Sequence, residues 1–248
     1  MADRSTAKTA AVLLIGNELL SGKVQDENLF VLAKTLGQLG IRLRRVVTIP
    51  DEIDVIAAEV KALADAYSVV FTSGGVGPTH DDLTVEGVAR AFGVAVVESA
   101  AMAAMLRGHY RERCNEAHLR MALIPEGAEL TSNTEVAWPT IVMRNVWLLP
   151  GIPEVFRMKL THVRERLGGG RPFVSRAVYT KLDEGELKPL LDAVVATHPD
   201  VEVGSYPKWS DPSYRTKLTF DGQETEVVGR AVDAFLRLLP AGEPQRID

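Results

Sequence analysis

The feature that most constrains the fold is a fully apolar run near the start of the chain, residues 10–15, which reads Ala-Ala-Val-Leu-Leu-Ile. A strand with apolar side chains at every position is typical of a parallel sheet covered on both faces. Leucines then recur at helical spacing up to Gly40, where a helix would end. Strand-like residues 42–49, a second amphipathic segment and a β-branched run at 68–72 continue the alternation. This order predicts a doubly wound, mostly parallel α/β sheet with helices on both faces.

The sequence Gly168-Gly-Gly-Arg-Pro172 predicts a domain boundary, because three glycines and a proline interrupt regular structure after a helix predicted at 153–167. We expect a first domain at residues 1–168 and a second at residues 172–248. The second has the predicted order strand, helix, strand, strand, helix. That order indicates a small α+β domain.

Charge and cysteine content narrow the classes of function. The formal net charge of −5 argues against a nucleic-acid-binding protein and against docking on anionic lipid, since both need a basic surface. A single cysteine, Cys114, excludes an internal disulfide and a multi-cysteine metal site, and fits a reducing compartment. Residues 1–9 are polar, and no run approaches the roughly 20 apolar residues of a membrane span. We therefore expect a cytoplasmic protein with neither a nucleic-acid nor a membrane partner.

A glycine-rich loop follows the third predicted strand and reads Ser73-Gly-Gly-Val-Gly-Pro-Thr-His-Asp-Asp-Leu-Thr84. Ligands of open α/β sheets bind at the carboxyl ends of the strands, where this loop lies. Its glycines allow a ligand to approach the backbone N–H groups, and the following helix adds the positive end of its dipole. The loop matches neither the dinucleotide fingerprint nor the Walker loop. It predicts a phosphate-binding site.

Two adjacent carboxylates, Asp81 and Asp82, stand beside this predicted anion site. Their charge would repel a phosphate unless a hard cation such as Mg²⁺ bridges the carboxylate and phosphate oxygens. The alternative is that one of them caps the helix that begins near Leu83. The sequence leaves both interpretations open, and each aspartate could do one of the two jobs.

Two further strand-to-helix loops contain glycine. The first predicted strand is followed by Gly16-Asn-Glu-Leu-Leu-Ser-Gly22 and then by Gln25-Asp-Glu-Asn28. A later strand is followed by Leu149-Pro-Gly-Ile-Pro-Glu154. All three loops would lie at the carboxyl edge of the sheet. Together they predict one pocket rather than three unrelated turns.

These three loops together resemble the MoaB/Mog-type molybdopterin-binding superfamily, over about residues 10–239. The resemblance is nearest to the N-terminal region of CinA (competence/damage-inducible) proteins and to the molybdopterin-binding-like domain of FAD synthases. The stretch Gly204-Ser-Tyr-Pro-Lys-Trp209 looks most similar to the FAD synthase domain and its stand-alone bacterial relatives. The glycine-threonine-alanine-proline-glycine stretch common in CinA proteins is missing, since Glu135-Val-Ala-Trp-Pro-Thr140 stands there.

The resemblance implies a divalent-metal-dependent hydrolase, using Mg²⁺ or Co²⁺, that cuts the pyrophosphate of a nucleotide such as ADP-ribose or FAD. It implies Asp82 and Asp81 as catalytic residues, and Asp82, Glu18 and Asp81 as metal ligands. The residues expected to bind substrate or phosphate come from all three loops: Ser73, Gly74, Gly75, Gly77, Pro78, Thr79, His80 and Thr84; Gly16, Asn17, Ser21 and Gly22; Pro150 and Gly151. Asn17 departs from the aspartate that many relatives carry, and an asparagine cannot act as a base.

Two other functions stay open at this point. One is molybdopterin binding with adenylyl transfer, in molybdenum cofactor biosynthesis. The other is a non-catalytic protein that binds a nucleotide or a pterin. The number of acids at the predicted site favours metal-dependent chemistry over plain anion binding. The resemblance also suggests a homo-oligomer.

Overall fold

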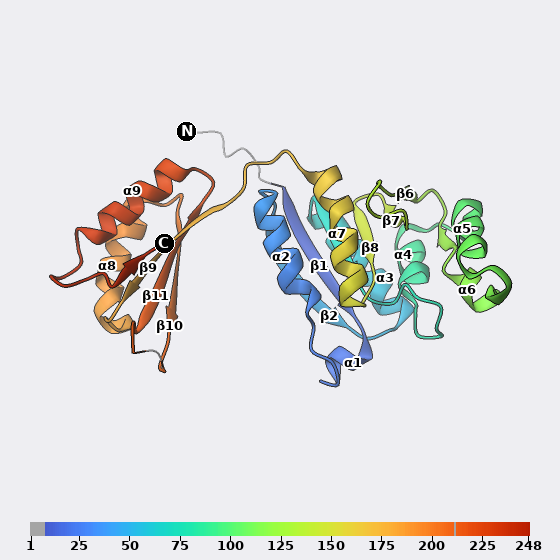
Figure 1. The fold of residues 1–248 in the computed structure, drawn as a ribbon, viewed down its shortest axis with the longest axis horizontal. Helices are drawn as coiled ribbons and strands as arrows, with labels where there is room; N and C mark the ends of the chain where they lie inside the picture. The colour runs from blue at the N-terminus through green and yellow to red at the C-terminus, as the bar shows by residue number, and fades with distance from the viewer. Residues whose placement is uncertain (1–7, 211) are drawn as a thin grey trace. The chain divides into compact units, whose positions relative to one another are not determined.

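The computed structural model describes residues 8–210 and 212–248 (Figure 1). Residues 1–7, which belong to the first predicted domain and to the polar N-terminal stretch, lie outside the described residues, as does Asp211. Two compact units divide between Gly170 and Arg171. Within the described residues, no helix combines the length and apolar character needed to cross a bilayer.

A six-stranded sheet in the order β2-β1-β3-β8-β7-β6 forms the centre of the first unit. Four of its strands run parallel: β1 (Thr9–Ile15), β2 (Arg42–Ile49), β3 (Val69–Ser73) and β8 (Val146–Leu149). Two more add an antiparallel edge: β7 (Thr140–Met143) and β6 (Glu129–Thr131). The predicted doubly wound, mostly parallel sheet is confirmed.

Helices cover both faces of this sheet (Figure 1). They are α2 (Asn28–Gln38), α3 (Ile53–Ala66), α4 (Thr84–Phe92) and α7 (Pro153–Leu167). The apolar run in β1 serves both layers. Leu13 and Ile15 belong to the core under α3 and α4, whereas Val12 and Leu14 belong to the core under α2 and α7. Each fully buried aliphatic side chain stabilises the fold by about 2 kcal/mol, which explains why no polar residue interrupts the run.

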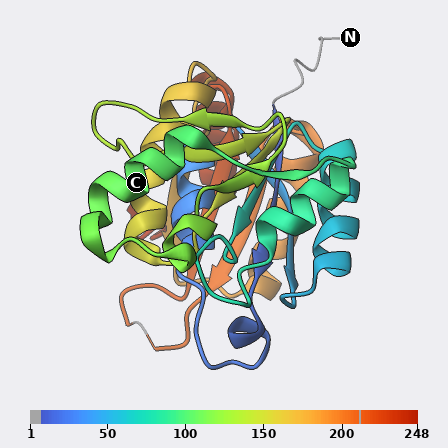
Figure 2. The same ribbon diagram turned by 90° about the vertical axis from the view of Figure 1, so that its right-hand side faces the viewer.

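A short helix and an excursion complete the first unit; the excursion lies nearest the viewer in Figure 2. The short helix is α1 (Asn17–Leu20). The excursion consists of β4 (Val96–Glu98), α5 (Ala100–Tyr110), a 3₁₀ turn (Arg111–Arg113), α6 (Glu116–Arg120) and β5 (Leu123–Pro125). β4 and β5 pair with each other and not with the main sheet. Asn115 and His118 begin α6 with a reciprocal capping box.

The second unit is a four-stranded antiparallel sheet, in the order β10-β11-β9-β12, with two helices. Its elements are β9 (Val174–Thr180), α8 (Glu184–Thr197), β10 (Glu202–Pro207), β11 (Thr216–Gly222), α9 (Thr225–Leu236) and β12 (Arg246–Ile247). Leu218 and Phe220 of β11 share one apolar core with Leu187 and Phe235 of the helices. The predicted small α+β domain is confirmed.

Two buried polar side chains of α7 hold the segment that leads into β7. The Lys159 side chain is 5% exposed, and its Nζ donates to the carbonyl oxygens of Trp138 (3.2 Å) and Pro139. Beside it, His162 Nδ1 lies 2.8 Å from the Thr140 hydroxyl. Burial lowers the pKa of Lys159 from 10.5 to about 7, because the charged ammonium loses its hydration.

This burial predicts a pH-dependent stability. In the unfolded chain Lys159 keeps its proton up to its ordinary pKa, whereas the folded protein releases it near pH 7. Since the unfolded state then binds more protons, the free energy of unfolding should rise with pH between about 7 and 10, by at most about 1.4 kcal/mol per pH unit. Urea unfolding at pH 7, 8 and 9 measures this rise. Lys159→Met should remove it and the exposed control Lys61→Met should not; equal slopes in all three proteins would contradict the prediction.

Candidate functional site

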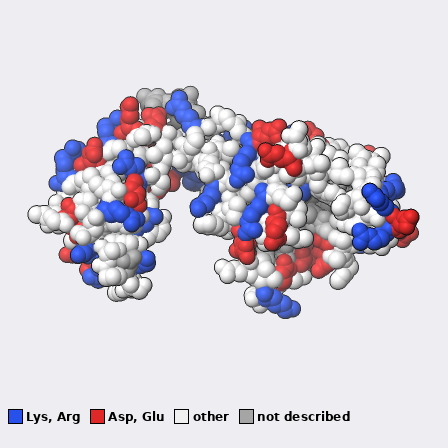
Figure 3. Space-filling model, viewed as in Figure 1, with Lys and Arg blue, Asp and Glu red and all other residues white. Residues whose placement is uncertain are grey.

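The loops that follow four parallel strands meet at one edge of the sheet, at the lower end of the first unit in Figures 1 and 2. Two backbone hydrogen bonds join neighbouring loops. The Gly16 N–H donates to Ile49 O at 3.2 Å, and the Gly74 N–H donates to Leu149 O at 3.1 Å. Figure 3 shows acidic side chains gathered at this end of the unit. The structure therefore brings together the three loops that the sequence indicates.

Gly74 and Gly75 stand where the chain leaves no room for a side chain. Their φ angles are 106° and 67°, in the left-handed region that favours glycine. A Cβ at Gly74 would clash with the backbone oxygen of Ile15, and one at Gly75 would clash with the Thr84 hydroxyl. That hydroxyl donates a hydrogen bond to Gly74 O at 2.8 Å. These contacts fix the start of the glycine loop against β1 and α4.

Asn28, which is 4% exposed at the start of α2, connects the glycine loop to the third loop. Its Nδ2 donates to Ser73 Oγ at 3.0 Å and to Gly151 O at 2.8 Å. Because a carbonyl oxygen can only accept, the contact with Gly151 fixes which way the amide points. Its Oδ1 is buried and has no hydrogen-bond partner among the described residues. The sequence pattern did not assign a role to Asn28, because its hydrogen-bond partners are 45 and 123 residues away in the chain.

Both carboxylate oxygens of Asp82 accept hydrogen bonds inside the glycine loop. Oδ1 accepts from the Gly77 N–H at 2.7 Å, and Oδ2 accepts from the N–H of Thr79 at 2.7 Å and from its hydroxyl. Asp82 does not cap the helix, because α4 begins at Thr84 and Leu83 occupies the N-cap position without a side-chain bond. Asp82 therefore holds the loop in shape, a role that neither interpretation of the sequence included.

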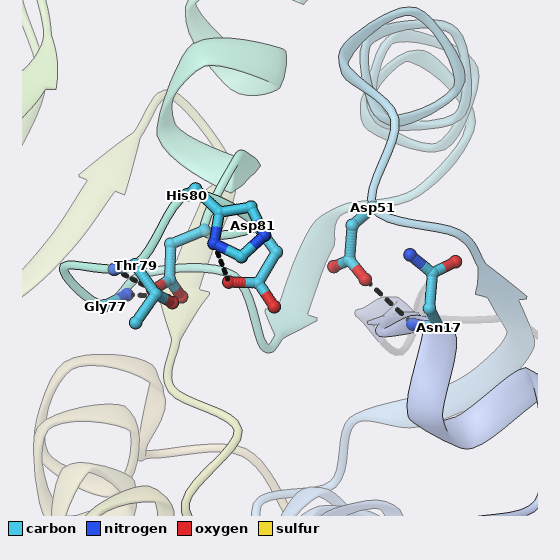
Figure 4. A network of polar contacts seen from close by, with 7 residues as sticks. Asn17, Asp51, Gly77, Thr79, His80 and Asp81 are labelled. Carbon is cyan, nitrogen blue, oxygen red and sulfur yellow. Dashed lines mark hydrogen bonds and ion pairs between the residues drawn. The ribbon is translucent and has the colours of Figure 1, made fainter.

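Asp81 differs from its neighbour, because its side chain is 58% exposed. His80 Nδ1 lies 3.9 Å from Asp81 Oδ1 (Figure 4). The Thr79 hydroxyl, the backbone N–H of Asp81 itself and the nearby His80 hold the pKa of Asp81 below its usual range. Asp81 is therefore ionised at neutral pH and open to a cation.

Asp51 joins the site, although the sequence analysis did not select it. It follows β2, and its Oδ2 accepts a hydrogen bond from the Asn17 N–H at 2.8 Å. Figure 4 shows the carboxylates of Asp51 and Asp81 facing the space between the glycine loop and α1. The available signal was positional: Asp51 follows the one neighbouring parallel strand whose loop contains no glycine.

The remaining predicted residues differ in their exposure to solvent. Ser73 and Thr84 are buried and bond within the protein, whereas Thr79, His80, Asn17, Ser21 and Gly22 are exposed. Pro78 and Pro150 are half-buried. Glu18 is exposed on α1, and its carboxylate lies over Gly16.

The three predicted metal ligands do not form a cluster. Among the described residues, no three or more His, Cys, Asp or Glu side chains are grouped so as to hold a metal ion. The structure therefore does not bring Glu18, Asp81 and Asp82 together as a set of three metal ligands. Metal binding at this edge stays a prediction, and Asp51 and Asp81 are the carboxylates not engaged inside the glycine loop.

Two family models cover the two units in turn. One, described as a probable molybdopterin binding domain, matches residues 11–168. The chain belongs to this molybdopterin-binding family. The other, the middle domain of FAD synthase, matches residues 172–247. The resemblance read from the three loops is thereby confirmed, and the second unit of the chain is similar to a part of FAD synthase.

Individual relatives agree with this assignment. A protein of Archaeoglobus fulgidus is 35% identical over 228 residues, which are 92% of this chain and 96% of its own length. The probable FAD synthase of Caenorhabditis elegans is 32% identical over 262 residues, so the chain spans about half of it. The crystal structure of the protein CinA from Thermoplasma acidophilum is 29% identical with a TM-score of 0.59, covering 65% of this chain and 98% of that one.

The packing at Gly74 predicts a large loss of stability on substitution. Gly74→Ala adds a Cβ against the Ile15 carbonyl at φ 106°, which should lower the free energy of unfolding by roughly 3 kcal/mol or more. Gly93→Ala is the matched control, because Gly93 also has a positive φ, 67°, but nothing lies within 4 Å of its added Cβ. The control should lose only about 1 kcal/mol. Equal losses in urea unfolding would show that the strand ends are not packed as described.

The contacts of Asn28 lead to a second prediction. Asn28→Ala removes one buried and one partly buried hydrogen bond to the loops after β3 and β8, so the free energy of unfolding should fall by about 2 kcal/mol. Asn17→Ala serves as the control, since its exposed side chain makes neither bond and it contacts Asp51 through its backbone. Urea unfolding of both variants measures the difference, and a loss below about 0.5 kcal/mol for Asn28→Ala, which is the range of ordinary surface substitutions, would count against this role.

Proposed function

We propose that the loop edge binds a nucleotide-containing pyrophosphate, such as FAD or ADP-ribose, and hydrolyses its P–O–P linkage with the help of a divalent metal ion, Mg²⁺ or Co²⁺. The observation that carries the proposal is the exposed, ionised Asp81 facing Asp51 beside a loop that ends in a helix N-terminus. Carboxylates and phosphate share a site favourably when a cation lies between them.

The phosphate part of the proposal rests on the start of α4. The glycine loop directly precedes this nine-residue helix, so the positive end of the helix dipole lies beside the loop. No side chain caps the first turn of the helix. Asp82 takes up the N–H groups of Gly77 and Thr79. The N–H groups of Gly75 and Val76 have no acceptor among the described residues, and both residues are half-buried. They are the donors that this loop offers to a phosphate oxygen.

The metal part rests on the chemistry of the donors. Mg²⁺ in phosphate-processing sites is commonly held by one or two carboxylates and by the substrate's own phosphate oxygens, with water completing the octahedron. Asp51 and Asp81 fit that requirement. A cage of three or more protein ligands is not needed for such an ion. Glu18 and Asp82 are the further oxygen donors implied by the family resemblance.

The reaction is the addition of water to one phosphorus atom, with cleavage of the bridging P–O bond. FAD then gives FMN and AMP, and ADP-ribose gives AMP and ribose 5-phosphate. A bound divalent ion supplies charge neutralisation at the phosphate oxygens and makes a nearby water more acidic. The Gly75 and Val76 amides orient the phosphate, and Asp81 holds the cationic side of the site. Asp82 keeps the turn from Gly77 to Thr79 in place beside these amides.

Molybdopterin binding is the second candidate, and the description of the matching family model favours it. Molybdopterin bears a phosphate that the same amides could bind. The two functions differ in outcome: the pyrophosphatase releases AMP from FAD or ADP-ribose, whereas a pterin-binding protein binds molybdopterin and leaves those nucleotides intact.

The test is AMP release from ADP-ribose, FAD and NAD by the full chain, with Mg²⁺, with Co²⁺ and with a chelator. We expect metal-dependent cleavage of at least one substrate. Asp81→Asn should lower kcat/KM by about a hundredfold or more, because it removes one charge from the cation site while keeping the side-chain volume. Asp51→Asn should act in the same direction.

Asp65→Asn is the control, because Asp65 pairs with Lys61 on the surface of α3, away from the loops. It should leave kcat/KM unchanged. Cleavage by Asp81→Asn and Asp51→Asn at the wild-type rate would refute the assigned cation site. Absence of cleavage for all three nucleotides, together with tight molybdopterin binding, would favour the second candidate.

A further inference from the structure

A small cleft lies behind the glycine loop, between that loop and α6. The residues that line it include Gly75, Gly77, Asp82, Glu86 and Arg120. Its volume is about 20 Å³, which is enough for one water-sized group such as a single phosphate oxygen. Among the described residues that line it, only Arg120 carries a positive charge. The cleft therefore brings the backbone of the glycine loop close to one positively charged side chain, that of Arg120.

The guanidinium of Arg120 makes few polar contacts with other described residues. Its Nη2 lies 3.8 Å from Glu86 Oε1, which is an ion pair but too long for a hydrogen bond. No described residue accepts a hydrogen bond from Arg120. Its side chain is 40% exposed, and that of Glu86 is 29% exposed. Ion pairs of this kind contribute little to stability, so the five N–H donors of Arg120 remain for a ligand.

We propose that Arg120 binds the pyrophosphate group of the ligand, exchanging its contact with Glu86 for two phosphate oxygens. The inference rests on the proposed function and adds a residue that sets its specificity for phosphate. A guanidinium presents parallel donors that match phosphate geometry. Held between the Gly75 amide and Arg120, a phosphate would put one oxygen into the cleft and have positive charge on both sides. The carboxylate of Asp82 in the cleft wall increases the need for that cation.

A purely structural role is the competing explanation, in which the pair of Arg120 and Glu86 ties α6 to α4. The two explanations predict opposite effects for Glu86→Gln. If the pair is structural, Glu86→Gln harms the protein as much as Arg120→Ala does. If Arg120 binds phosphate, Glu86 competes for it, and Glu86→Gln leaves binding unchanged or tighter.

The experiment is calorimetric titration of the full chain with inorganic pyrophosphate and Mg²⁺. Arg120→Ala should weaken binding roughly tenfold to a hundredfold, and Arg120→Lys should recover part of the loss because it keeps charge without the paired donors. Glu86→Gln should bind as tightly as the wild type or more tightly. The control Arg113→Ala changes an exposed arginine in the 3₁₀ turn before α6 and should have no effect. Thermal unfolding of each variant reports the state of the fold.

The outcomes separate this inference from the proposed function. If the wild type binds pyrophosphate and Arg120→Ala binds it equally well, Arg120 has no such role and the proposed function stands. If Glu86→Gln loses binding together with Arg120→Ala, the pair is structural and the inference is wrong. If the wild type binds no pyrophosphate, the inference is wrong, and the release of AMP from the nucleotides decides the proposed function separately. Should Arg120→Ala not fold, Arg120→Lys and Glu86→Gln decide between the explanations.

Discussion

The site depends on one buried amide. Asn28 sits on the first turn of α2 and bonds to the hydroxyl at the end of β3 and to the carbonyl after β8. Two backbone hydrogen bonds join neighbouring loops beyond the strand ends, and Asn28 adds a side-chain link between the loops after β3 and β8. Gly74 lies close to Gly151, since a Cβ added at Gly151 would stand 3.4 Å from the Gly74 Cα. The glycines permit the close approach, and Asn28 maintains it.

Electrostatics then determines what such an edge can bind. The strand ends carry Asp51 and Asp81 as well as Asp82, while backbone amides and the α4 dipole attract an anion. This mixture of charges supports the proposal that the edge binds a phosphate together with its own cation. Arg120 supplies positive charge in the cleft whose lining also includes the carboxylates of Asp82 and Glu86.

Regular elements were predictable where the pattern was long and its ends were marked. The helix at 153–167 was found with its correct bounds, because Pro153 suits the first turn and Gly168 follows the last. The strands β5 and β6 were missed, since three residues are too few to show a period. At the site, the glycines were predictable because their chemistry is local. Asn28 and Asp51 were not assigned, since their roles arise from contacts between residues distant in the chain.

The limit of prediction from the sequence is clearest at Asp81 and Asp82, because these adjacent residues are both aspartate. The turn from Gly77 to Thr79 directs two N–H groups and a hydroxyl at Asp82, and this network consumes both of its oxygens. Asp81, one residue earlier, is turned outward and ionised. A phosphate ligand would act on the two differently: it would raise the demand for a cation at Asp81, whereas Asp82 is already neutralised in part by its donors. The two aspartates differ because the fold of the loop turns Asp82 toward these donors and Asp81 toward solvent. Two adjacent identical residues in a sequence do not indicate which of them will point inward.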